Sequence, residues 1–320
     1  MKYAIITIMK VMKKENIIPL RMTISLLIII IAAGIILWFL LSDKDKDKID
    51  EPYIESINLV ITVPWNTGNT ADLIVRAITS NADINAEILN ISGSNGALGI
   101  NEAFASVRDG ENILFTNFSS VVTSNLTGFT ETDASDWVYW FTAFSPGVVV
   151  TRADSRHNSL DDLLFAAELS VTVSNAGGGT MSYIAAQLLE NEQNVAFIHR
   201  DYPGINPAIN AVLEGEADFL IAPKSDVINL INTGQLKILD EQSDFGEWYS
   251  FMLPKDTGEN ILCFYDELWN EAINSEAFAL FAEENGLTAQ LPNRETSAGI
   301  AAYTAEIIEQ VLRETGYIGG

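Results

Sequence analysis

Two hydrophobic patterns alternate along the chain from residue 57 onward. Apolar, β-branched runs such as INLVITV (57–63) and NILFTN (112–117) are separated by stretches whose apolar residues recur every three or four positions, as on one face of a helix. Strands that alternate with helices are typical of an α/β fold built on a mainly parallel sheet that is covered on both faces. The pattern therefore predicts an α/β protein.

The predicted elements form two series and a tail. The first series has strands at 57–63, 86–91 and 112–117 and helices at 70–80 and 98–107. The second has strands at 170–175, 195–200 and 218–223 and helices at 180–191 and 206–214, with strands at 148–150 and 236–239 on either side. The tail has a strand at 248–253 and helices at 261–273, 276–285 and 297–314. Two such series predict two lobes, and we expect the tail to pack back on the first.

The N-terminus follows a different pattern. Residues 22–41 are 20 consecutive residues without a charge, long enough as a helix to cross a bilayer. The basic residues in 1–21 place that end in the cytoplasm, so the residues beyond 41 are expected outside. A cleaved signal peptide is the alternative, although the apolar run is longer than usual. We predict a cytoplasmic N-terminus (1–21), a transmembrane signal-anchor (22–41) and a charged tether (42–55).

Charge excludes one class of partner. The 320 residues carry a net charge of -25, and residues 51–320 alone hold 10 Lys and Arg against 38 Asp and Glu. A body this acidic repels a phosphate backbone, so nucleic acid is not expected as a partner.

Catalytic and metal-binding signatures are not found. Cys263 is the single cysteine, which rules out an intramolecular disulfide and a cysteine-based zinc site, and we interpret it as a small buried hydrophobe. His157 is interpreted as a surface residue in a polar turn, and His199, at the end of a strand, either lines a cleft or has no role in one. No nucleotide-binding or hydrolase motif occurs, so we expect neither a cofactor nor enzymatic activity.

Glycines gather where predicted strands turn into helices. They are Gly68, then Gly93, Gly96 and Gly99, and then Gly177, Gly178 and Gly179. In open α/β sheets ligands bind at these turns, and a helix N-terminus there can hold an anion without Lys or Arg. Each glycine could instead only permit a tight turn.

Five segments, in order, resemble the motifs of one family. They are VPWNTGNTADLIVR (63–76), NISGSNGALGINEAFASVRDG (90–110), SNAGGGTMSYIAAQLL (174–189), DYPGINPAINAVLEGEADF (201–219) and INTGQLKIL (231–239). They are similar to signatures of the solute-binding proteins of tripartite tricarboxylate transporters, the TctC or Bug family. Trp65 replaces the usual Phe, Asn69 a Gly and Tyr183 a His, and the segment between Leu239 and Trp248 is shorter than usual.

The resemblance implies a two-lobed periplasmic-binding-protein fold of type II, the Venus flytrap, with lobe I at 56–148 plus 242–320 and lobe II at 149–241. It also implies that loops of both lobes hold a small carboxylate, largely through backbone N–H groups. The ligand-binding residues expected in the first lobe are Trp65, Asn66, Thr67, Gly68, Asn69 and Thr70, with Ser94, Asn95 and Asn117 completing the wall. Those expected in the second lobe are Asn175, Ala176, Gly177, Gly178, Gly179 and Thr180, with Tyr202 at the far end of the ligand. Asp72 is expected to brace its helix.

Two functions are consistent with this resemblance. The first is a membrane-anchored extracytoplasmic receptor that captures a small organic carboxylate and delivers it to the membrane permease subunits of a tripartite tricarboxylate-type transporter. The alternative is a ligand-sensing domain that signals through a membrane kinase. No cofactor is implied in either case.

Overall fold

The computed structural model describes residues 59–319 except 83, 168–169 and 291–292. They belong to one compact unit that spans Ser56–Gly320. The predicted transmembrane helix, at residues 22–41, lies outside the described residues. Within the described part of the chain, no helix is both long and apolar enough to cross a membrane.

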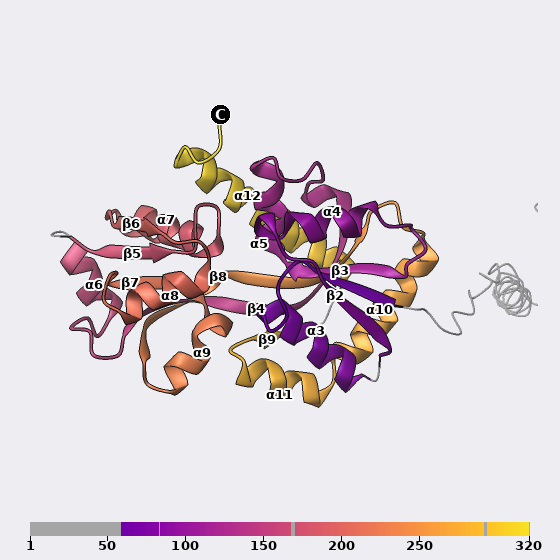
Figure 1. Ribbon diagram of the computed structural model, residues 1–320, viewed down its shortest axis with the longest axis horizontal. Helices are drawn as coiled ribbons and strands as arrows, with labels where there is room; N and C mark the ends of the chain where they lie inside the picture. The colour runs from indigo at the N-terminus through magenta and orange to yellow at the C-terminus, as the bar shows by residue number, and fades with distance from the viewer. Residues whose placement is uncertain (1–58, 83, 168–169, 291–292, 320) are drawn as a thin grey trace, which may run out of the picture. The chain divides into compact units, whose positions relative to one another are not determined.

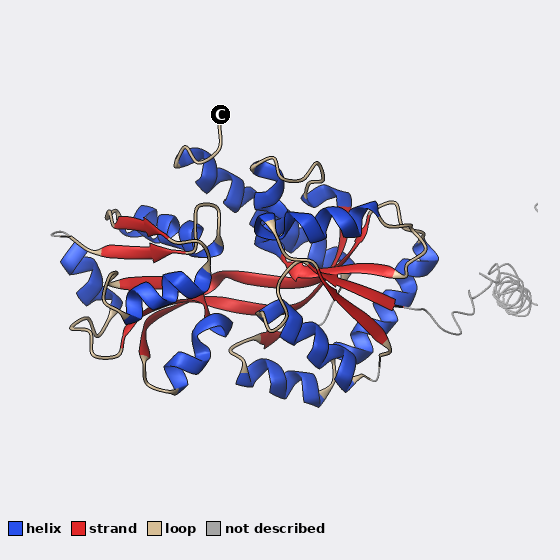
Figure 2. Cartoon of the chain, in the orientation of Figure 1, coloured by secondary structure: helices blue, strands red, loops and turns tan. Residues whose placement is uncertain are grey.

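Two lobes share one mixed sheet whose strand order is β2-β1-β3-β8-β4-β7-β5-β6, and β9 pairs with β4 (Figures 1 and 2). The first lobe contains β1 (Leu59–Val63), β2 (Ala86–Asn90), β3 (Asn112–Asn117), α3 (Thr70–Asn81), α4 (Ala97–Ala105) and α5 (Phe118–Leu126). The second contains β5 (Thr172–Asn175), β6 (Ile198–Asp201), β7 (Phe219–Pro223), α6 (Leu160–Ala167), α7 (Met181–Gln193), α8 (Ile205–Leu213) and α9 (Lys224–Asn232). The tail forms α10 (Glu259–Ile273), α11 (Glu276–Glu284), β9 (Thr288–Ala289) and α12 (Arg294–Glu314). The α/β prediction is confirmed.

Two long strands run through both lobes (Figure 1). β4 (Trp137–Arg152) and β8 (Leu236–Pro254) pair antiparallel, while β1 pairs parallel with β2 and β3, and β5 with β6 and β7. The sheet is therefore mixed rather than mainly parallel. The chain crosses from the first lobe to the second in β4 and returns in the opposite direction in β8. The predicted lobe boundary at 148/149 falls inside β4, and the boundary at 241/242 falls inside β8. The division of the chain at these two positions stays a prediction.

The register between β4 and β8 breaks where the lobes meet. Pro146 pairs with Gly246 but Gly147 pairs with Gln242, so β8 carries extra residues at this point. A proline is tolerated in a strand at such an irregularity because no ladder hydrogen bond is required of it. Gly246 has no space for a side chain, since a Cβ there would overlap the carbonyl oxygen of Ser145. The irregularity brings the residues that follow it, Glu247 to Tyr249, to the junction of the lobes.

Helices cover both faces of each half of the sheet, as the hydrophobic pattern predicts. On one face of the first lobe, α3 and the tail helix α10 pack with buried side chains such as Ile74, Tyr265 and Trp269. On the opposite face, α5 and α12 bury Phe118 and Leu312 in a second apolar cluster. The tail thus packs on the first lobe, as expected from the sequence.

Candidate functional site

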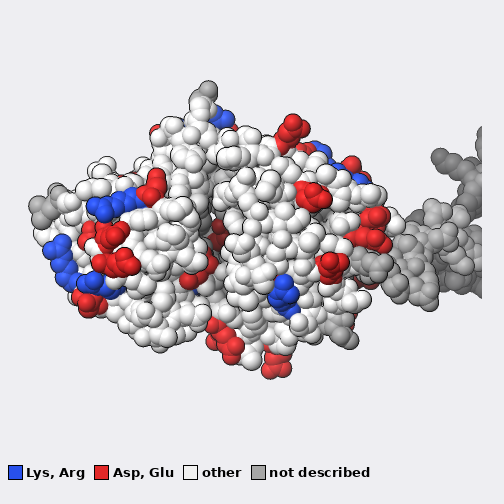
Figure 3. Space-filling view, viewed as in Figure 1, with Lys and Arg blue, Asp and Glu red and all other residues white. Residues whose placement is uncertain are grey.

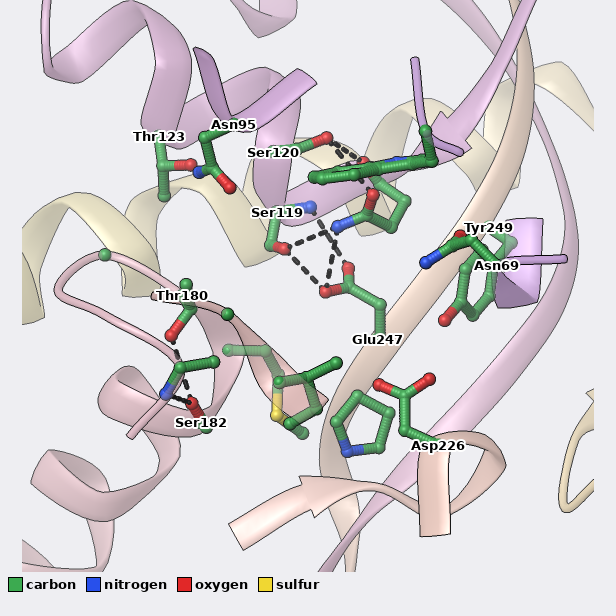
Figure 4. A pocket seen from close by; sticks show the side chains of 18 residues that line it. Asn69, Asn95, Ser119, Ser120, Thr123, Thr180, Ser182, Asp226, Glu247 and Tyr249 are labelled. Carbon is green, nitrogen blue, oxygen red and sulfur yellow. Dashed lines mark hydrogen bonds between the residues drawn. The ribbon is translucent and has the colours of Figure 1, made fainter. Parts of the chain in front are cut away.

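A pocket of about 150 Å³ lies between the lobes (Figure 4). Since each water-sized group occupies about 15 Å³ of such a volume, the pocket suits a solute of roughly ten non-hydrogen atoms. Its first-lobe and crossing-strand lining consists of Trp65, Asn69, Asn95, Asn117, Ser119, Ser120, Thr123, Glu247 and Tyr249. Its second-lobe lining consists of Ala176, Gly179, Thr180, Met181, Ser182, Gly204, Ile205, Pro223 and Asp226.

Five helices begin at this pocket. Their N-cap residues all line it, and they are Asn69 of α3, Asn117 of α5, Thr180 of α7, Gly204 of α8 and Pro223 of α9. The first N–H groups of a helix lack partners within the helix and carry a partial positive charge. The pocket can therefore attract an anion although none of its lining residues is Lys, Arg or His.

The loop before α7 is held by its own hydrogen bonds. Gly177 and Gly179 have φ angles of 108° and 77°, in the region that favours glycine. The hydroxyl of Thr180 donates to the carbonyl of Gly177 at 2.6 Å, and the N–H of Ala176 donates to Ser182 Oγ at 2.8 Å. These bonds place the start of α7 and two hydroxyl groups, those of Thr180 and Ser182, at the wall of the pocket (Figure 4).

Trp65 forms part of the opposite wall. Its indole N–H donates to Thr116 Oγ1 at 3.0 Å, and its ring lies against Gly96, where a Cβ would be 3.3 Å from the ring. Gly99 similarly leaves room for Pro64. The two glycines thus permit the close approach of the loop after β1 to the start of α4.

Glu247 projects from β8 into the pocket and is 4% exposed. Its carboxylate accepts from the N–H of Ser119 at 3.1 Å, the hydroxyl of Ser119 at 2.5 Å and the amide of Asn117 at 3.3 Å. Burial raises the pKa of Glu247 to about 7, although these hydrogen bonds lower it and the nearby Asp226 raises it further. The chain's own carboxyl group therefore occupies the N-terminus of α5.

Asp226 reaches the same space from the first turn of α9. Its Oδ1 accepts from the hydroxyl of Thr70 at 2.7 Å, a hydrogen bond that joins α9 of one lobe to α3 of the other. Burial raises the pKa of Asp226 to about 6, and the bond to Thr70 lowers it. Burial and the two carboxyl groups also raise the pKa of Tyr249 well above its ordinary value. Among the described residues, no group of three or more His, Cys, Asp or Glu side chains is placed to hold a metal ion.

Seven of the sixteen residues predicted to bind ligand line the pocket, and they are Trp65, Asn69, Asn95, Asn117, Ala176, Gly179 and Thr180. Thr70 lies beside it, bonded to Asp226. In the same loop, the side chain of Asn66 accepts from Ser92 and that of Thr67 donates to Asn90, while the N–H of Gly68 donates to Asp72. These three hold the loop together rather than line the pocket.

The remaining predicted residues also lie outside the lining. Ser94 is an exposed turn residue with a φ of 48°, and Gly177 accepts the Thr180 bonds. Asn175 is fully buried and its amide donates to His199 and Asp201. Tyr202 donates to Glu216, away from the pocket lining. At Gly178 a Cβ would overlap the ring of Tyr317, so this residue borders the C-terminal segment instead.

The sequence prediction missed eleven lining residues, namely Ser119, Ser120, Thr123, Met181, Ser182, Gly204, Ile205, Pro223, Asp226, Glu247 and Tyr249. Eight of them could have been found by one rule, because they stand within three residues of a strand-to-helix or loop-to-helix junction. Glu247 and Tyr249 had no such signal, since their position depends on the irregular register of β8.

Four other predictions concern single residues. Asp72 was expected to brace its helix: it is 1% exposed, accepts from the guanidinium of Arg76 one turn further along α3, and also accepts from the N–H of Gly68 in the loop before the helix. The interpretation of His157 as a surface residue is wrong, because it is 4% exposed and its ring accepts from Arg156. The interpretation of Cys263 as buried is also wrong, because its position in α10 faces solvent. His199 does not line the pocket and is bonded to Gln187 and Glu190.

Two lobes, two crossing strands and a pocket surrounded by helix N-termini define a solute-binding protein of the periplasmic type. The family model described as the tripartite tricarboxylate transporter family receptor, TctC, matches residues 88–245. Protein BugT of Bordetella pertussis is 22% identical over 286 residues, which cover 79% of this chain and 88% of BugT. The chain belongs to this TctC or Bug receptor family, as the sequence motifs indicated.

Solved structures show the same fold. A TctC solute-binding protein from Polaromonas, without ligand, superposes with a TM-score of 0.68 at 19% identity, covering 80% of this chain and 98% of that one. MatC from Rhodopseudomonas palustris with bound malate gives a TM-score of 0.62 at 18% identity, covering 80% and 97%. A second protein of that organism, with adipate, gives 0.69 at 15% identity, covering 81% and 97%.

Proposed function

We propose that the protein is an extracytoplasmic receptor that captures a small organic acid between its lobes and delivers it to a membrane permease of the tripartite tricarboxylate type. It acts as a binding protein and not as an enzyme. Residues 22–41 anchor it to the cytoplasmic membrane in this proposal. Relatives of the same fold that hold malate and adipate support the ligand class.

One observation carries the proposal: helices from both lobes begin at a single pocket whose lining contains no basic side chain. The ligand's carboxylate is assigned to the start of α7, where the N-cap Thr180 makes no capping hydrogen bond to the helix. The N-terminus of α5 is not free for it, because Glu247 already accepts from Ser119 there. A carboxylate at α7 gains N–H donors and the positive end of the helix dipole without any ion pair.

Ligand binding stabilises the arrangement in which both lobes contact the solute. Because the pocket is lined from both lobes, a ligand there makes contacts that no single lobe can provide, and this difference in affinity shifts the population toward closure. The crossing of β4 and β8, with its broken register, is the natural hinge. A closed receptor presents a surface that the open receptor lacks, which is what a permease needs in order to recognise the loaded form.

The direct test is a thermal-shift screen of the full chain in detergent against mono-, di- and tricarboxylates, amino acids, sugars and inorganic cations. A ligand at 100 times its dissociation constant adds about 2.7 kcal/mol to the free energy of unfolding. We expect stabilisation by one or more small organic acids of about ten non-hydrogen atoms. Stabilisation by a sugar or an inorganic cation alone would contradict the proposal.

A further inference from the structure

Two carboxyl groups face the same part of the pocket from different elements. Glu247 comes from the crossing strand β8 and Asp226 from the start of α9, and both line the pocket. Figure 4 shows the carboxyl group of Glu247 turned toward Ser119, with the carboxyl group of Asp226 turned toward the side chains of Glu247 and Tyr249. Figure 3 shows acidic side chains in the groove between the lobes. The Asp226 carboxylate is close enough to Glu247 to raise the pKa of the latter by repulsion.

Among the residues that the structure describes, no Lys, Arg or His is bonded to either of these two groups. Every hydrogen-bond donor to Glu247 is neutral, and Asp226 receives only the hydroxyl of Thr70 on Oδ1. Within the described residues, no hydrogen bond is made to Asp226 Oδ2, and Lys224, two positions away, is bonded to Glu241. Buried carboxylates without an opposite charge are costly, so such groups usually have a cationic partner.

Asp72 shows what a structural carboxylate looks like in this protein. It is 1% exposed, close to the 4% of Glu247, but Arg76 forms an ion pair with it at 2.9 Å. The partly buried Asp266 is likewise paired with Arg294, at 2.8 Å. The pocket carboxylates differ from both because, in the part of the chain that the structure describes, no basic side chain forms an ion pair with them.

The opposite wall of the pocket is suited to a negatively charged group. Thr180, Ser182 and Gly204 line the pocket at the starts of α7 and α8, and neither helix has a side-chain hydrogen bond from its N-cap residue. The first N–H groups of a helix have no partner within the helix and carry a partial positive charge. The pocket thus has an acidic side and a side suited to an anion, within a volume for about ten non-hydrogen atoms.

We propose that the ligand is a small zwitterion, an amino acid, whose ammonium group binds between Asp226 and Glu247 while its carboxylate faces the starts of α7 and α8. This inference rests on the proposed receptor function and names the ligand class more narrowly. An ammonium group supplies three N–H donors and one positive charge, which match the unpaired oxygen of Asp226 and the acidic character of this wall.

The test compares matched acids that differ by an amino group. Affinities of the full chain in detergent are measured by calorimetry for glutamate and glutarate, aspartate and succinate, and 6-aminohexanoate and hexanoate. We expect at least one amino compound to bind about 10- to 100-fold more tightly than its deaminated partner. Asp226→Asn and Glu247→Gln should each reduce this ratio toward one. Asp161→Asn, which removes an exposed acid on α6, is the matched control and should preserve the ratio.

Dependence on pH separates this inference from its closest rival, in which protonated Asp226 and Glu247 donate hydrogen bonds to a carboxylate. Tyr249 is the other titratable group facing the pair. If the pair binds ammonium, affinity rises between pH 5.5 and 8, as the two acids ionise. Affinity that rises as pH falls would overturn the inference.

Other outcomes overturn the inference in distinguishable ways. Deaminated acids that bind as tightly as their amino partners, or tighter, would overturn it and leave the receptor function standing. A thermal shift produced by Ca²⁺ or Mg²⁺ alone would assign the acidic pair to a metal ion. Failure of all six acids to bind would overturn the inference; the proposed function is contradicted as well only if no organic acid in the thermal-shift screen stabilises the protein.

Discussion

Thr70 and Asp226 are joined across the two lobes by a hydrogen bond of 2.7 Å, although 156 positions separate them in the sequence. The donor is the first residue of α3 and the acceptor lies in the first turn of α9. The contact therefore links the starts of two helices that both begin at the ligand pocket. A bond at this place couples the acidic side of the pocket to the position of the lobes.

Thr70→Val should loosen the contact between the lobes. The variant keeps the shape of the side chain but removes the hydroxyl donor, so the ligand-free protein should become more open. Small-angle scattering should then show a larger radius of gyration without ligand. Thr67→Val is the matched control, because Thr67 bonds only to Asn90 within the first lobe. Equal effects of the two substitutions would contradict a role for the Thr70 bond in holding the lobes together.

Glu247→Gln should change how stability depends on pH. The pKa of Glu247 is raised from 4.5 to about 7 by burial, so the folded protein binds this proton more tightly than the unfolded chain. The contribution of Glu247 to the free energy of unfolding therefore falls as pH rises from 4.5 to about 7. Glu247→Gln cannot ionise, so it should be more stable above pH 7, by up to roughly 3 kcal/mol, and about equally stable below pH 4.5.

Urea unfolding of the ligand-free protein at pH 4.5 and at pH 8 measures this difference. Asp161→Asn serves as the control for the loss of one negative charge, and we expect it to track the natural protein at both values. A Glu247→Gln variant that is less stable than the natural protein at pH 8 would show that the ionised carboxylate is favoured in the folded state.

Gly178→Ala should disturb the contact between the second lobe and the C-terminus. A Cβ at this position would overlap the ring of Tyr317, whose ring also lies 5.9 Å from that of Tyr183. Overpacking of this kind costs about 1–3 kcal/mol, and adding Tyr317→Ala should restore part of that loss by making space. Gly299→Ala, in α12 and with no atom within 4 Å, is the control and should not destabilise. Additive effects of Gly178→Ala and Tyr317→Ala in thermal unfolding would mean that the two residues do not interact.

Most of the fold could be predicted because its elements have regular periods. The strands at 112–117 and 86–91 and the helix at 70–80 are found in the structure within one or two residues of their predicted ends. Missed elements lack a distinct pattern: α5 begins directly after β3, and its sequence FSSVVTSNL has the β-branched and polar residues of a loop or strand. Packing of Phe118 against residues of β3 and α12 stabilises α5 as a helix.

The site was harder to predict than the fold. Glycine turns and family motifs located one loop on each side of the pocket, including Trp65, Asn69 and Thr180. Residues such as Asn66 and Asn175 share those loops, but their side chains are used in local hydrogen bonds to Ser92 and His199. Glu247 was not found because it belongs to the pocket only through tertiary structure, since a broken strand register brings it there. Asp226 was not found because no helix was predicted directly after the strand at 218–223, where α9 begins.

The central claim is that the start of α7 holds the ligand's carboxylate, and Thr180→Asp tests it most directly. Aspartate is a favourable N-cap, so the fold should persist, but its carboxylate would occupy the N–H groups assigned to the ligand and repel it. Ser275→Asp makes the same change at the N-cap of α11, which does not line the pocket. Calorimetry with the tightest acid should show a loss of at least about 100-fold in Thr180→Asp and natural affinity in Ser275→Asp. Unchanged affinity in a folded Thr180→Asp variant would contradict the account.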